Sequence, residues 1–153
     1  MRLIIMLLVI GASCFVNSND SWADFDVLDV ALASSVRGRQ PVKPVSPSAH
    51  CEKDKSGKAS LPIIDSSKWR KVFLWARIAS SSKGSIRHTW HQYINDVWET
   101  VSVVDLPISP SPGYRMWSAK AFRKINPIGD WMIVLAPSHE PQRVLCITRF
   151  SVK

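Results

Sequence analysis

The C-terminal part of the chain alternates apolar and polar residues with a period of two, the pattern of strands that bury one face. From residue 61 onward, six segments show this pattern and are rich in β-branched and aromatic residues, with clusters of Gly, Pro, Asn and Ser between them. Such a series predicts an all-β fold, a small antiparallel β-sandwich that is immunoglobulin-like or carbohydrate-binding-module-like. The predicted strands are Lys71–Ala79, Ser85–Ile94, Val97–Leu106, Tyr114–Phe122, Trp131–Ala136 and Val144–Val152.

The same alternation predicts which side chains share a face. His88 and Trp90 are two residues apart in one predicted strand, so they point to the same side. Arg115 and Trp117 likewise share a face of another strand, and Lys120 takes the opposite face. Between two strands, Asn95-Asp96 predicts a tight hairpin.

The N-terminal residues indicate export. Leu3–Ile10 is an unbroken apolar run behind Met1-Arg2, too short to span a bilayer and typical of a signal peptide. Cleavage after Ala23 is favoured over cleavage after Ser18, so residues 1–23 are predicted to be the signal peptide. Acylation of Cys14 as a lipoprotein and retention as an uncleaved anchor stay open. We expect a periplasmic or secreted protein, membrane-anchored in the last two cases.

The next residues lack the period of two. Apolar residues of 24–33 alternate irregularly with three aspartates, which favours a short amphipathic helix. Residues 34–60 have no apolar periodicity, and Pro41, Pro44 and Pro47 recur at the three-residue period of polyproline II. The sequence therefore predicts a disordered linker over 34–60 and assigns the sandwich domain to 61–153.

Composition adds a strong positive charge to this picture. Lys and Arg total 20 against 12 Asp and Glu, a net +8, while 46% hydrophobic residues exclude a wholly disordered chain. Removing residues 1–23 takes away one base and one acid, so the charge belongs to the remainder. A basic protein attracts acidic partners, and export argues against nucleic acid. The linker carries a net +4, so it is predicted to be a solvated tether or to contact anionic lipid headgroups.

Cysteine spacing indicates one structural bridge. Cys14 lies in the predicted signal peptide, which leaves Cys51 and Cys146 as an even pair in an oxidising compartment. We therefore predict a Cys51–Cys146 disulfide. The alternative is a buried thiol at Cys146 and a free thiol at Cys51.

Four short motifs occur in order: Gly84-x-Ile86-x-His88-x-Trp90, Arg115-x-Trp117-Ser118-x-Lys120, Gly129-x-Trp131 and Phe150-x-Val152. Together they resemble the bacterial domain of unknown function 2914 family, and the resemblance covers about residues 69–152. That resemblance implies a small β-rich domain, often exported or membrane-tethered, and carries no activity with it. The Pro-rich segment Pro107–Gly113, read as a loop, departs from the compact turns expected there.

The indoles and cations of these motifs are the candidate ligand-binding residues. Trp rings stack on sugar rings, while Arg, Lys and His hydrogen-bond hydroxyl or carboxylate groups. The competing interpretation is structural, because Trp on a central strand usually fills a core and a neighbouring His satisfies a buried polar group. The structural interpretation is favoured for Trp90, Trp117 and Trp131. The candidates are His88, Trp90, Arg115, Trp117, Lys120 and Trp131.

Catalytic and metal chemistry find little support. His88 and His91 are three apart on a strand and so lie on opposite faces, which excludes joint metal binding. No glycine loop for phosphate is present, so neither a metal nor a cofactor is predicted. The preferred function is a non-catalytic exported protein that binds an envelope protein or an acidic polysaccharide. The alternative is a glycan-modifying or hydrolytic accessory enzyme using His88, Arg115 and Lys120, which requires an accessible His88.

Overall fold

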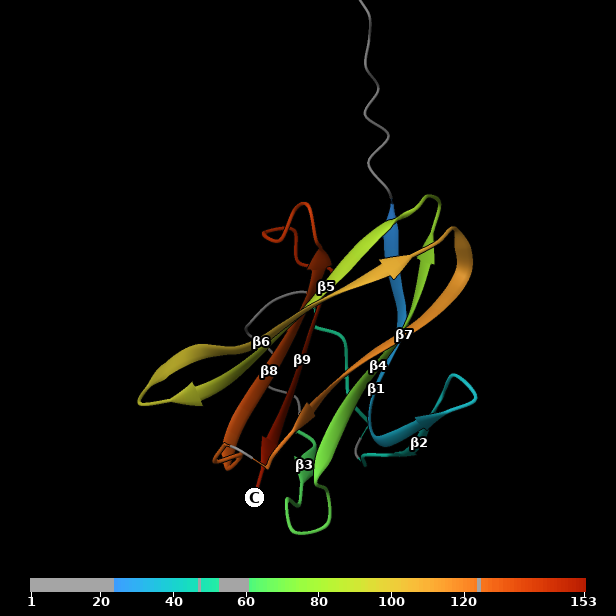
Figure 1. Cartoon of the computed structure of the whole chain (residues 1–153). Helices are drawn as coiled ribbons and strands as arrows, with labels where there is room; N and C mark the ends of the chain where they lie inside the picture. The colour runs from blue at the N-terminus through green and yellow to red at the C-terminus, as the bar shows by residue number, and fades with distance from the viewer. Residues whose placement is uncertain (1–23, 47, 53–60, 124) are drawn as a thin grey trace, which may run out of the picture.

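Two β-sheets stack face to face in the computed structural model, which describes residues 24–46, 48–52, 61–123 and 125–153 (Figure 1). One sheet has the order β2-β1-β4-β7 and the other β3-β9-β8-β5-β6. Every pairing is antiparallel except that of β3 with β9. The predicted β-sandwich is confirmed.

Across the described residues the chain forms nine strands and no helix. All six predicted strands are present, with their ends moved by a few residues. The Pro107–Gly113 loop is largely strand, because β6 continues to Ile108 and β7 starts at Ser111. The strands are β1 Phe25–Arg37, β2 Gln40–Pro44, β3 Ile63–Ile64, β4 Lys71–Ser80, β5 Gly84–Ile94, β6 Val97–Ile108, β7 Ser111–Ala121, β8 Gly129–Pro137 and β9 Cys146–Val152.

The core lies between the sheets and is built from alternate residues of the central strands. β4 contributes Leu74 and Ile78, and β8 contributes Ile133 and Leu135, all fully buried. As the alternation predicts, the row from Ile86 to Gln92 on β5 faces inward. Burial of these apolar rows is the main stabilising term of the fold.

The helix predicted over 24–33 is wrong, because these residues begin β1. β1 pairs with β4 from Phe25↔Ser80 to Ala33↔Phe73, and its register shifts between Val27 and Asp29. One extra residue in that bulge separates the inward-facing Val27 and Val30 by three positions. A spacing of three imitates a helical stripe, which explains the error.

The predicted linker over 34–60 is also wrong for its described residues. β1 continues to Arg37, and β2 carries Pro41 and Pro44 on the edge of its sheet, where a missing N–H costs no ladder bond. Val45 and Ala49 beyond it are buried in the core. The sandwich therefore starts at β1 and not at residue 61. Residues 53–60 and the predicted signal peptide 1–23 lie outside the described residues.

The Cys51–Cys146 disulfide is confirmed, across a sequence separation of 95. It lies beside a bridge in which Glu52 N donates to Ile147 O at 2.8 Å and Ile147 N donates to Glu52 O at 2.7 Å. Thr148 Oγ1 also donates to His50 O at 3.2 Å. These contacts fasten the segment after β2, which leaves the first sheet, to β9 of the second.

The Asn95-Asp96 hairpin is confirmed, with φ of 49° and 64° at its two central residues. Positive φ at both positions is what a two-residue turn of type I′ requires. This hairpin of β5 and β6 projects from the side of the sandwich (Figure 1).

Within the described part of the chain, no helix has the length and apolarity needed to cross a bilayer.

Candidate functional site

His88 belongs to a buried polar group that joins the two sheets. It lies on β5 with no exposed surface, and its Nδ1 is 2.8 Å from Ser118 Oγ on β7. Trp90 Nε1 donates to the same oxygen at 3.1 Å. His88 Nε2 is buried without a hydrogen-bond partner among the described residues. The predicted proximity of His88 and Trp90 is confirmed, and both are core residues.

This arrangement excludes His88 as an accessible catalytic base. A serine beside a histidine can form a nucleophile and base, but a working pair needs access to substrate and an orienting acid on the second nitrogen. Here both side chains are buried, and no carboxylate of the described residues accepts a hydrogen bond from Nε2. Arg115 and Lys120 also point to opposite faces of β7, so the three residues of the enzyme alternative do not assemble.

Burial lowers the pKa of His88 from its usual 6.5 to about 4, because a charged imidazole loses its hydration there. Between these pH values the unfolded chain binds a proton at residue 88 that the native protein does not. The free energy of unfolding therefore falls as the pH falls from 6.5 to 4. We expect His88 to account for about 3 kcal/mol of this loss in urea unfolding measured at intervals across that range.

His88→Gln should remove this pH dependence, because an amide can still bond Ser118 but does not titrate. Gln92→Asn, at a buried residue of the same strand that does not titrate, is the matched control and should keep the wild-type slope. Hydrogen bonds from Arg87 and, to a smaller extent, from Ser138 lower the pKa of Asp105 to about 2. Protonation of that carboxylate therefore lowers the free energy of unfolding only in a more acidic range. An unchanged slope in His88→Gln would show that His88 is not the titrating group.

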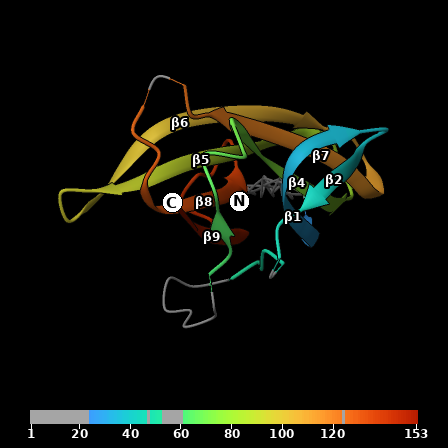
Figure 2. The same cartoon turned by 90° about the horizontal axis from the view of Figure 1, so that it is seen from below.

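A groove lies at the edges of β6 and β7. Both strands are terminal in their sheets and lie along the same side of the sandwich (Figure 2). The groove is open, with a volume of about 440 Å³. Its lining combines two guanidinium groups and two aromatic rings with apolar side chains. The lining residues are Arg39, Leu106, Pro107, Tyr114, Arg115, Met116 and Trp117.

Arg39 reaches this groove from the turn between β1 and β2. Gly38 and Arg39 have φ of 54° and 61°, which permits a tight turn. Trp75 Nε1 donates to Arg39 O at 3.0 Å and holds the turn against β4. The Arg39 guanidinium then lies 5.6 Å from the centre of the Tyr114 ring, and its Nη2 donates to Arg115 O at 3.3 Å. A cation–π contact therefore forms one wall of the groove.

Positive charge in and beside the groove is uncompensated. Arg115 is half-buried, and its Nε is buried with no hydrogen-bond partner among the described residues. Arg77 on β4 stands directly opposite Arg115 in the register. Like charges in that position repel. No carboxylate of the described residues forms an ion pair with Arg39, Arg77 or Arg115.

The structure divides the predicted ligand-binding residues into three environments. Trp131, like His88 and Trp90, is fully buried and inaccessible to a ligand. Lys120 donates from Nζ to Val101 O at 3.2 Å and so bridges β7 to β6. Of the six predicted residues, only Arg115 and Trp117 line the groove. The favoured core position of Trp117 is wrong, because this side chain is 38% exposed.

Sequence reasoning missed Arg39 and Tyr114. The predicted linker includes Arg39, although Gly38 before it signals a turn between two strands. Tyr114 lies in a predicted strand, but the alternation gives no sign that it belongs to a site. The projecting hairpin carries an exposed aromatic pair, Tyr93 and Trp98, whose ring centres are 5.2 Å apart. In the residues that the structure describes, no three His, Cys, Asp or Glu side chains are grouped to hold a metal ion.

No family model matches the chain, and no curated protein matches its sequence. Among solved structures, it is similar to a Niemann-Pick type C2 protein from Japanese carpenter ant, at 12% identity over 84% of this chain and 92% of that one, with a TM-score of 0.46. It is also similar to a β-D-glucoside glucohydrolase from Trichoderma reesei, at 9% identity over 86% of this chain and 19% of that one, with a TM-score of 0.40. At these values neither likeness identifies a ligand or an activity.

Proposed function

We propose that this protein is an exported, non-catalytic binding protein whose groove between β6 and β7 holds an acidic saccharide. The observation that carries the proposal is the uncompensated pair Arg39 and Arg115 beside the exposed ring of Trp117. A flat indole stacks on a sugar ring, and a guanidinium donates two parallel hydrogen bonds to a carboxylate.

The size of the groove favours a saccharide over an envelope protein. Ligand pockets usually have volumes of about 300–1,000 Å³, and the groove, at about 440 Å³, lies in that range. A stable protein interface buries roughly 800 Å² on each partner, far more surface than seven lining residues offer. An anion at this point would also relieve the repulsion between Arg77 and Arg115.

The disulfide supports the exported location. Disulfides persist in the periplasm and outside the cell and are rare in the cytosol. Cys51–Cys146 joins two segments of the folded domain, as a structural bridge does. Together with the apolar run at residues 3–10, it supports a periplasmic or secreted protein.

Calorimetric titration with a trisaccharide of galacturonic acid tests the binding proposal, and maltotriose serves as the neutral control. We expect heat of binding with the acidic sugar only. Trp117→Ala and Arg115→Gln should each weaken the affinity about tenfold or more, because each removes a central contact. Added salt should weaken it as well.

The matched control is Trp98→Ala, which removes an indole that is 40% exposed on the other sheet. This variant should bind the acidic sugar as the wild type does. Equal affinity for both trisaccharides, or an equal loss in Trp98→Ala and Trp117→Ala, would contradict the proposed site.

A further inference from the structure

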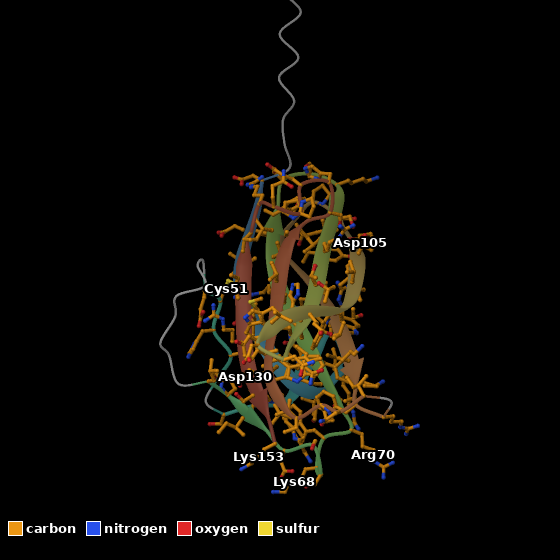
Figure 3. The ribbon with its side chains drawn as sticks, turned by 90° about the vertical axis from the view of Figure 1, so that its left-hand side faces the viewer. Cys51, Lys68, Arg70, Asp105, Asp130 and Lys153 are labelled. Carbon is orange, nitrogen blue, oxygen red and sulfur yellow. A yellow bond between two sulfur atoms is a disulfide. The ribbon has the colours of Figure 1, made fainter. Side chains whose placement is uncertain are left out.

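One end of the sandwich carries a second group of cations, away from the groove. Figure 3 shows Lys68 and Arg70 at this end, while Asp105 lies toward the other. Lys71 pairs with Ala121, and Phe122 N donates to Arg70 O at 3.1 Å, which brings Arg123 beside them. We name Lys68, Arg70, Lys71 and Arg123 the basic end. All four residues are exposed.

Acidic side chains do not neutralise the basic end. Asp65 pairs with Lys68 at 3.4 Å. Among the described residues, no carboxylate forms an ion pair with Arg70, Lys71 or Arg123. Arg70, Lys71 and Arg123 therefore face solvent without an ion-pair partner in the part of the chain that the structure describes.

Arg70 lines two hollows at the basic end. One has a volume of about 400 Å³ and the other about 210 Å³. Each brings basic groups and an aromatic side chain around a space large enough for a phosphate. The first is lined by Ser34, Lys68, Trp69, Arg70, Lys71 and Phe73, and the second by Ser66, Arg70, Phe122 and Arg123.

Exposed apolar side chains occur at the same end. Ile63 on β3 pairs with Ser151 near the end of β9, and Gly129, beside Ile128, pairs with Val152. Ile63 is 54% exposed and Ile128 is 51% exposed. Cations next to exposed apolar residues suit the boundary between lipid headgroups and acyl chains. At that boundary the cations can contact lipid phosphates, and the apolar side chains can contact acyl chains.

We propose that the basic end docks on the headgroups of an anionic phospholipid bilayer. Arg70, Lys71 and Arg123 contact lipid phosphates, while Ile63 and Ile128 enter the interface. The inference does not depend on saccharide binding, since it uses none of the groove residues. It also places the lipid contact on another part of the folded domain than residues 34–60, for which the sequence offers it as one of two roles.

Vesicle flotation tests this docking with the chain from Asp24 to Lys153, which contains both sheets. The vesicles are phosphatidylcholine alone, or phosphatidylcholine and phosphatidylglycerol at roughly three to one, and we expect binding to the second only. The triple variant Arg70→Gln, Lys71→Gln, Arg123→Gln should lose about fivefold in partitioning for each cation removed. Arg70→Lys with Arg123→Lys keeps the charge and should bind as the wild type does.

A second triple variant, Lys53→Gln, Lys55→Gln, Lys58→Gln, removes the same charge from the segment between Glu52 and Leu61 and is the matched control. Retained binding in this variant supports the basic end. An equal loss in both triple variants would show attraction by net charge alone, and a loss only in the control would assign the contact to that segment; either result overturns the proposal. Saturable heat of binding with inorganic phosphate, together with no flotation on either kind of vesicle, would indicate a soluble phosphate ligand instead and overturns it too. Circular dichroism verifies that each variant is folded.

Discussion

Replacing both bridge cysteines, as Cys51→Ser with Cys146→Ala, should lower the free energy of unfolding by about 4–5 kcal/mol. The bridge spans 95 residues, so it removes a large share of the conformational freedom of the unfolded chain. A small domain has a total stability of about 5–15 kcal/mol, so this loss brings the variant close to unfolding at ambient temperature. Urea unfolding followed by tryptophan fluorescence measures the difference.

The reduced wild-type protein is the control, because it loses the bridge but keeps every side-chain atom at the buried Cys146. Reduced wild type and double variant should agree to within about 1 kcal/mol, the cost of the small cavity left by the missing sulfur. If both were as stable as the oxidised protein, the bridge would contribute nothing, and the contacts of Glu52 and His50 with β9 would hold the segment by themselves.

Trp131→Ala should cost about 4 kcal/mol of folding free energy. Trp131 is fully buried and stacks on Phe150, with ring centres 6.0 Å apart and planes 13° from parallel. Its ring also lies 6.0 Å from that of Phe122, and its Nε1 donates to Pro127 O at 2.8 Å. The truncation opens a cavity at the centre of an aromatic cluster and leaves a carbonyl without its donor.

Two further variants separate these effects by urea unfolding. Trp131→Phe keeps a ring in the cluster and should cost less than Trp131→Ala, because it gives up the hydrogen bond and only part of the volume. Trp98→Ala removes an exposed indole and should cost less than about 1 kcal/mol. Similar losses for Trp98→Ala and Trp131→Ala would contradict the assignment of Trp131 to the core.

Much of the fold could be predicted because strand formation leaves a local mark. Residues two apart on a strand share a face, so a buried strand shows alternation within a few residues, as in Ile86 to Gln92. The Asn95-Asp96 turn is local for the same reason. β1 was misassigned because one bulge residue broke the alternation at Leu28, and β2 because prolines tolerated on an edge imitate a linker. Neither feature is visible before the neighbouring strand is known.

The candidate site was predicted only in part. Arg115 and Trp117 were placed on one face of a strand, as the structure shows, but their companions come from distant segments. Arg39 arrives on a hairpin turn held by Trp75, 36 positions away in the sequence. Burial of His88 is likewise decided by the other sheet, which covers the inner face of β5. Trp117 is exposed because it lies on the outer face of β7, between the buried Met116 and Ser118.

The sequence by itself determined the all-β class, six strand positions, the β5–β6 turn and the cysteine pairing, because these follow from local periodicity, turn chemistry and cysteine count. Tertiary structure alone decided which indoles form the core, which face solvent, and that Arg39 and Arg115 lie together. These properties depend on how the two sheets stack and where each sheet ends. Stacking is fixed by burial of apolar area summed over the whole chain, and no short segment carries that information.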